Sequence, residues 1–211
     1  MIKSQNPALD ARVETTQNKA NDMDWKNDLI KQAIAKIVRV CTVAPIFAAI
    51  ILIAMWASGQ LTLVAGITAT CCLVALPLLS YPLQLIIPPL KAKGRKGQRD
   101  LAIVFSVVGY VVLAALSLAL GFTAEIRVLA FTYLFSGILI LLTSFSSLKC
   151  SGHASGIAGP IVYLSYFVSP YFAFLAIVLV AVAWSSVVLK RHTIWEFVGG
   201  SVVPVIAFAL S

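Results

Sequence analysis

Residues 154–189 read ASGIAGPIVYLSYFVSPYFAFLAIVLVAVAWSSVVL, a run of 36 residues without one charged side chain. As a single helix this run would be about 54 Å long, whereas the hydrocarbon core of a membrane is about 30 Å thick. We therefore expect it to cross a membrane twice. The break is predicted at Ser169-Pro170, because proline donates no backbone hydrogen bond and disfavours helix at the preceding residue. Gly156, Gly159 and Pro160 are a second place at which the first of the two helices would loosen.

Five other uncharged runs accompany this one, and the composition agrees with them. Hydrophobic residues make up 60% of the 211 residues and charged residues only 11%, which is far from the usual composition of soluble domains. With two spans in residues 154–189, the sequence predicts seven spans and an all-α, polytopic membrane helical bundle. The other runs are Val40–Ala57, Leu61–Leu90, Leu101–Thr123, Val128–Leu148 and the residues after Glu196 up to Ser211.

The N-terminal region is polar and divides into three predicted parts. Residues 1–23 are expected to be a disordered tail without the order of a signal peptide. Residues 24–38 alternate apolar side chains with Lys26, Lys31 and Lys36, as in a basic amphipathic helix on a membrane surface. The alternative is a solvated extension of the first span. Residues 39–60 then form that span.

Basic residues predict the orientation. With seven spans, every Lys and Arg except Arg127 falls on one face of the membrane, which the positive-inside rule makes cytoplasmic, together with the N-terminus. Most of them lie close to spans and outside any aromatic-rich soluble domain, so nucleic acid is a poor partner. The basic residues of this face are Lys3, Arg12, Lys19, Lys26, Lys31, Lys36, Arg39, Lys91, Lys93, Arg95, Lys96, Arg99, Lys149, Lys190 and Arg191.

The chain has two histidines, and both lie at the ends of apolar runs on the predicted cytoplasmic face. His153 follows Ser151-Gly152, a small turn whose backbone N–H groups suit an anion. His192 precedes Glu196 by four residues, and on a helix this spacing lets the carboxylate hold one imidazole nitrogen and leave the other for attack. The four cysteines have neither a disulfide pattern nor a metal-type spacing.

The arrangement resembles the type 2 phosphatidic acid phosphatase (PAP2) superfamily. The third motif of that family is Ser-Arg, five residues, His, three residues and an acid, and here Ser185-Ser186 precedes His192 and Glu196 at the same spacing. The second motif is matched by Cys150-Ser151-Gly152-His153, with cysteine in place of proline. The first motif is approximated by Lys91, Lys93, Arg95 and Arg99-Asp100.

The resemblance implies a six-helix catalytic core in residues 61–211, to which the span at residues 39–60 is an addition. It implies a lipid phosphatase that works without a metal ion or other cofactor through a phosphohistidine. His192 would attack phosphorus, Glu196 would orient His192, and His153 would protonate the leaving oxygen. The implied phosphate-binding residues are Lys91, Arg95, Arg99, Lys149, Ser151, Gly152, Lys190 and Arg191. The implied partners are a phosphorylated lipid, such as phosphatidate or a polyprenyl mono- or diphosphate, and the bilayer itself.

Two departures from the family pattern bear on the function. Asp100 stands in place of the first-motif proline and adds a negative charge, as a partner for Arg99 or as a sign of a changed substrate. Ser186 stands where the third motif has arginine, so a fork-shaped donor suited to phosphate oxygens is missing. Lys190, four residues further on, is a candidate substitute on the same helical face. Two alternatives to hydrolysis remain: phosphoryl transfer to an acceptor other than water, and a degenerate relative that binds or moves a phosphorylated lipid.

Overall fold

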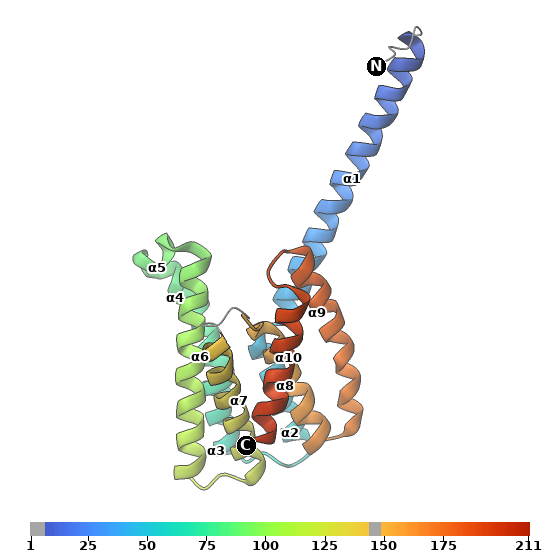
Figure 1. Cartoon of the computed structure of the whole chain (residues 1–211). Helices are drawn as coiled ribbons and strands as arrows, with labels where there is room; N and C mark the ends of the chain where they lie inside the picture. The colour runs from blue at the N-terminus through green and yellow to red at the C-terminus, as the bar shows by residue number, and fades with distance from the viewer. Residues whose placement is uncertain (1–6, 144–148) are drawn as a thin grey trace.

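A computed structural model describes residues 7–143 and 149–211, and this part of the chain is all-α. The helices pack side by side into a bundle, and one long N-terminal helix projects from it (Figure 1). The fold class predicted from the sequence, a polytopic helical bundle, agrees with this architecture.

The run at residues 154–189 folds back on itself as predicted. α8 (Gly152–Phe167) ends before Ser169, whose extended backbone (φ −164°, ψ 136°) begins a short 3-10 helix, η2 (Pro170–Leu175), and α9 (Ala176–Val188) returns through the bundle. The Ser169 hydroxyl accepts a hydrogen bond from the Tyr171 N–H and caps the new helix. The break at Ser169-Pro170 is confirmed.

Four helical segments in the described residues are long and apolar enough to cross a membrane, and a bent pair at the N-terminus is a fifth candidate. The predicted number of seven is therefore higher than helix length alone supports. α8 and α10 (Ile194–Ala209) have 16 residues each, about 24 Å, which is shorter than a hydrocarbon core. Both nevertheless run beside the longer helices (Figure 1).

The four long candidates are built from the remaining elements. The first, Leu63–Ile86, comprises α3 (Leu63–Thr70), one turn of π-helix, η1 (Cys71–Ala75), and α4 (Leu76–Ile86). The second, Asp100–Ala119, lies within α6 (Gly94–Ala119), which follows the short α5 (Pro88–Ala92). The third is α7 (Ala124–Thr143), and the fourth joins η2 to α9 as Pro170–Val188. Residues 144–148, the end of the run predicted as Val128–Leu148, lie outside the described residues.

The N-terminus differs from the prediction in two ways. α1 is a single helix from Pro7 to Cys41, so the described part of the predicted disordered tail, from Pro7 to residue 23, is helical. Proline suits a first helical position, and the Ala, Leu, Arg, Glu, Gln and Lys residues that follow are good helix formers. The span predicted as one helix at residues 39–60 is interrupted near its start, where α1 and α2 (Ala44–Ala57) meet at a bend of 45°. Pro45 explains the bend, because it cannot donate to the Cys41 carbonyl and its ring would clash with it.

α2 lies inside the bundle, although the sequence predicted an addition to a complete core. Ile51 and Met55 of α2 are fully buried in the main hydrophobic cluster, together with Leu113, Leu129 and Tyr163 from three other helices. Gly156 of α8 permits this packing, since a Cβ there would lie 2.6 Å from the Ala44 Cβ. The N-terminal helices are therefore held firmly against α8.

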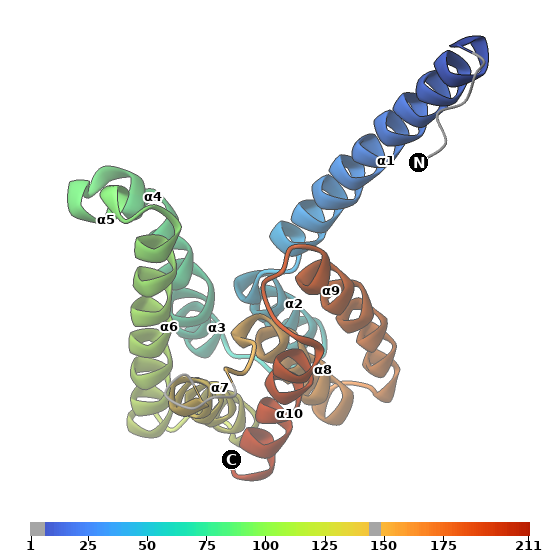
Figure 2. The same ribbon diagram turned by 45° about the horizontal axis from the view of Figure 1, so that its top comes forward.

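Among the described residues, the basic residues other than Arg127 lie toward one end of the bundle, in α1 or in and beside the connections at that end. α1, α5, the start of α8 and the segment between α9 and α10 all lie at this end, which we call the basic end (Figures 1 and 2). Arg127, in the first turn of α7, lies at the opposite end. The charge asymmetry predicted from the sequence is thus an asymmetry of the folded bundle.

Candidate active site

His192 lies in the short segment that joins α9 to α10 at the basic end. After α9, Lys190 adopts a positive φ of 51°, a left-handed conformation common at helix ends. Thr193 then caps α10: its hydroxyl accepts from the Glu196 N–H (3.2 Å), and the Glu196 carboxylate accepts from the Thr193 N–H (2.8 Å). His192 therefore precedes the helix on which the sequence placed it.

The predicted pairing of His192 with Glu196 is nevertheless present. His192 Nδ1 lies 3.3 Å from Glu196 Oε2, and the two side chains are 24% and 22% exposed. The Thr193 backbone hydrogen bond, followed by the charge of His192, lowers the pKa of Glu196, so this carboxyl is ionised at neutral pH. The capping box fixes the carboxylate, and the carboxylate in turn fixes the imidazole.

His153 lies in the first turn of α8 and is tied to the His192 segment through the backbone. The N–H of Ser151, the N-cap of α8, donates to the Glu196 carbonyl (2.8 Å). Gly200, one turn further along α10, makes room for this contact, because a Cβ at that position would lie 2.3 Å from the Ser151 carbonyl oxygen. The two histidine-bearing segments are thus joined directly.

Thr42, at the junction of α1 and α2, contacts the His153 ring. Its Oγ1 lies 3.0 Å from His153 Nε2 and donates its one hydrogen to the Val38 carbonyl (2.7 Å). Nε2 must then be the donor to Thr42, which assigns the neutral tautomer and leaves the lone pair of the ring on Nδ1.

The electrostatic surroundings of His153 are positive. Burial, then the charge of Arg39, then that of His192 lower the pKa of His153 to about 3, so the ring is neutral at pH 7. His153 lies just before the apolar part of α8, at the basic end of the bundle. A neutral ring that lies close to the charge of Arg39 suits a negatively charged ligand, whose charge would make protonation of the ring easier.

The sequence did not reveal the contact that Arg39 makes, because Arg39 was counted only among the basic residues that set the orientation in the membrane. From the last turn of α1, its Nη1 donates to the Ser186 Oγ of α9 (3.3 Å). Ser186 occupies the motif position at which the PAP2 family has arginine, and it is fully buried. A guanidinium therefore lies beside the motif position, although it comes from another helix. The absence of arginine at position 186 was the one signal in the sequence that a basic residue from another helix lies beside this position.

The predicted phosphate-binding residues divide into two groups. Lys149, Lys190 and Arg191 are exposed on the segments that flank His153 and His192, and Gly152 is the first residue of α8. Ser151 is fully buried: its N–H donates to the Glu196 carbonyl, and its hydroxyl accepts from the Ala154 N–H. Its backbone N–H is therefore used within the protein.

The first-motif residues lie apart from the histidines. Lys91 is exposed on α5, and both views show α5 well separated from the α9–α10 segment (Figures 1 and 2). This loop matched the family pattern least closely. The side chains of Arg95 and Arg99 lie outside the described residues.

We compared the chain with known proteins. No family model, curated protein or solved structure matches it. The likeness to the PAP2 superfamily stays a prediction from motifs. Within the described residues, no three His, Cys, Asp or Glu side chains come together as metal ligands.

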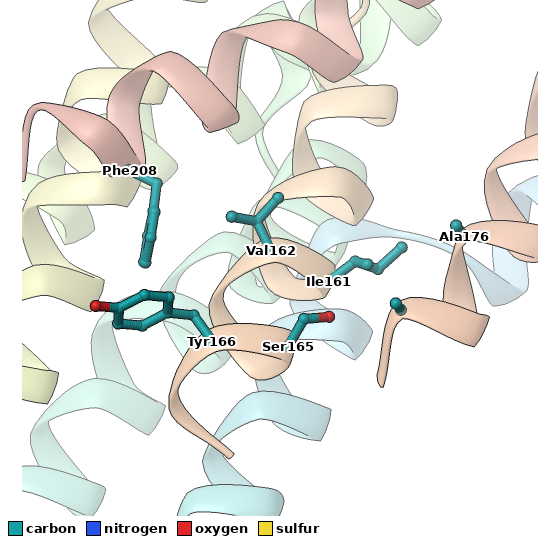
Figure 3. Close-up of a pocket in the computed structure, with 7 residues that line it drawn as sticks. Ile161, Val162, Ser165, Tyr166, Ala176 and Phe208 are labelled. Atoms are coloured by element: carbon teal, nitrogen blue, oxygen red, sulfur yellow. The ribbon is translucent and has the colours of Figure 1, made fainter. Parts of the chain in front are cut away.

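A cavity of about 430 Å³ lies away from the histidines, between α8, η2, α9 and α10 (Figure 3). Apart from Ser165 and Tyr166, its lining is apolar and includes Ile161 and Phe208. These α8 residues follow His153 by eight to thirteen positions, which is about 12–20 Å along the helix. The cavity is therefore separate from the candidate active site.

Proposed function

We propose that this chain is a membrane-embedded lipid phosphatase of the PAP2 type, with His192 as nucleophile and His153 as proton carrier. One observation carries the proposal: the only two histidines of the sequence come from distant segments that the Ser151–Glu196 backbone bond joins. One histidine is oriented by a carboxylate, and the other is surrounded by cations. This is the arrangement that nucleophilic attack on a phosphate ester needs.

The reaction has two steps. Glu196 holds Nδ1 of His192, so Nε2 attacks phosphorus, the bond from phosphorus to the lipid oxygen breaks, and that oxygen takes a proton from His153. In the second step His153 takes a proton from water, the water oxygen attacks phosphorus, and the phosphorus–nitrogen bond breaks to release inorganic phosphate. A bound phosphate dianion offsets the neighbouring positive charges and raises the pKa of His153, which lets that ring hold the proton.

The position of the site favours a lipid substrate. His153 and His192 lie at the basic end of an apolar bundle, where the head group of a lipid would meet the exposed Lys149, Lys190 and Arg191. Phosphatidate and polyprenyl mono- and diphosphates share this chemistry, a terminal phosphoryl group on an apolar chain. We place this end on the cytoplasmic side by the positive-inside rule, with α8 and α10 crossing beside the longer spans.

Phosphate release by the detergent-purified protein tests the proposal. The panel contains phosphatidate, lysophosphatidate, phosphatidylglycerophosphate and polyprenyl mono- and diphosphates, each with EDTA. His192→Ala should lower turnover at least a thousandfold, because the nucleophile is lost. Tyr171→Phe, at an exposed position at the other end of the bundle, is the control and should match the parent protein. Equal turnover by His192→Ala and the parent protein would falsify the mechanism.

Binding without hydrolysis is the second candidate function. Two observations favour it: Ser186 replaces the motif arginine, and the Ser151 N–H is occupied within the protein. In that case no lipid of the panel releases phosphate, yet the protein retains a phosphorylated lipid through purification. Mass spectrometry of extracted lipid distinguishes this outcome from hydrolysis.

A further inference from the structure

The end of α1 and the residue that follows it contact α9 and the first turn of α8. Ala35, Arg39 and Thr42 follow one another at spacings of four and three, so they share one helical face. Ala35 is fully buried, Arg39 bonds to Ser186 of α9, and Thr42 contacts His153 of α8. This face of α1 therefore packs on the site, while Ile30, Ile34 and Ile37 of α1 are exposed.

We propose that Arg39 is a phosphate-binding residue of the site, although it comes from the N-terminal helix and not from the segments that carry the family motifs. The inference rests on the proposed function and gives it a specific donor: the guanidinium holds the phosphoryl oxygens that Ser186 cannot reach. It assigns the N-terminal helices a place in the chemistry, in addition to their place in the hydrophobic core.

Chemistry favours a binding role over a purely structural one. A guanidinium is protonated at any physiological pH and presents five N–H donors in a planar fork that matches phosphate oxygens. A hydroxyl such as that of Ser186 needs only one neutral donor, which many side chains supply. The positive charge also lies close enough to act on His153 together with His192. The positive charge that Arg39 brings to this part of the site attracts an anion such as a phosphate monoester.

The anchoring of Arg39 is precise enough for such a role. The bend after Cys41 positions Thr42 against His153, and the close contact between Ala44 and Gly156 fixes the same junction on α8. Donors that are held before the substrate arrives stabilise the transition state without a further cost of reorganisation. The Arg39 backbone is held on both sides, by Ala35 and by Thr42.

Arg39→Gln is the decisive variant. Glutamine removes the charge and is two bonds shorter than arginine, so a loss is assigned to phosphate binding only if an arginine placed at position 186 restores activity. We expect kcat/KM for phosphatidate to fall roughly 10²–10³-fold, the effect of removing one preorganised donor. Lys36→Ala, which removes an exposed charge from the preceding turn, is the control and should stay within twofold of the parent. Arg39→Gln with Ser186→Arg should recover at least tenfold.

A binding measurement separates this inference from the hydrolysis proposal. Dihexanoyl phosphatidate is titrated calorimetrically into His192→Ala protein with and without Arg39→Gln, and dihexanoyl phosphatidylcholine serves as the ligand without a phosphomonoester. We expect Arg39→Gln to weaken phosphatidate binding at least tenfold and to leave the circular dichroism spectrum unchanged. Equal binding by the two proteins would overturn the role of Arg39, even if His192 proves essential. Arg39-dependent binding would support it, even if no lipid is hydrolysed.

Discussion

At the residue scale, the candidate site depends on two side chains whose protonation is set by their neighbours. Glu196 stays ionised because the Thr193 N–H and His192 stabilise its charge, and His153 stays neutral because it is buried among cations. These two protonation states suit the proposed roles: the ionised carboxylate orients a nucleophile, and the neutral ring can accept a proton.

The low pKa of His153 makes stability depend on pH. The unfolded chain protonates this ring below pH 6.5, whereas the folded protein protonates it only near pH 3, so stability is complete above pH 6.5 and is lost as the pH falls toward 3. Between pH 7.5 and 5 the loss should be about 2 kcal/mol. The charges facing the ring are Arg39 of α1 and His192 of the α9–α10 segment.

Thermal unfolding in detergent, followed by circular dichroism at the two pH values, measures this effect. The parent protein should lose more stability than His153→Gln, which has no ring to protonate. An equal loss in both proteins would mean that His153 titrates normally in the folded state.

Thr42 is predicted to fix the tautomer of His153. Thr42→Val keeps the shape of the side chain but removes the acceptor for the Nε2 hydrogen. The ring then loses its orientation, and we expect kcat to fall roughly 10–100-fold while KM changes little, because the phosphate donors remain. Steady-state kinetics with phosphatidate provide the measurement. If KM rises and kcat stays unchanged, Thr42 serves substrate binding and not proton transfer.

At the element scale, the site depends on how closely α10 approaches the start of α8. The hydrogen bond from Ser151 to Glu196 exists only because Gly200 has no side chain at the contact. Even a methyl group at position 200 would therefore not fit between α10 and the start of α8.

Gly200→Ala should therefore impair both folding and activity. The new Cβ would lie 2.3 Å from a backbone oxygen, so α8 and α10 must move apart. We expect a loss of roughly 1–3 kcal/mol, typical of overpacking, and a fall in kcat larger than the fall in folded protein. Val202→Ala, at an exposed position of the same helix, is the matched control. Normal activity in Gly200→Ala would show that the Ser151–Glu196 contact is dispensable.

Element by element, local signals were readable in the sequence and long-range contacts were not. Proline marked the turn at Ser169-Pro170, and the spacing of His192 and Glu196 revealed their pairing, because both features lie within a few residues. The contact of Arg39 with Ser186 joins positions 147 residues apart, and no local pattern records it. Helix length alone supports fewer spans than the seven predicted from uncharged runs, because Ser151 and Thr193 begin α8 and α10 as helices of only 16 residues.

At the scale of the whole molecule, the N-terminal helices belong to the bundle and to the site. α1, with 35 residues, is about 52 Å long, and only its last turns contact the other helices closely. α2 fills part of the hydrophobic core. From about residue 35 onward, the N-terminal helices therefore pack with the rest of the bundle.

Truncation tests this division. Removing residues 1–22 leaves Ala35, Arg39 and Thr42 in place, and kcat/KM should stay within threefold of the full chain. Removing residues 1–43 deletes Arg39 and Thr42, and activity should fall at least a hundredfold. Both proteins are assayed with phosphatidate after purification in detergent, with helical content as the measure of folding. Full activity in the shorter protein would confine the site to the motif segments.

The distance in sequence between Arg39 and the α9–α10 segment has a consequence for biosynthesis. A ribosome makes Arg39 long before Glu196, so the contacts that complete the candidate site can form only after the helices from α2 to α9 have emerged. Contacts of such long sequence separation are slow to form. A nascent chain would therefore have the helices from α2 to α9 inserted in the membrane before the proposed phosphatase site could form.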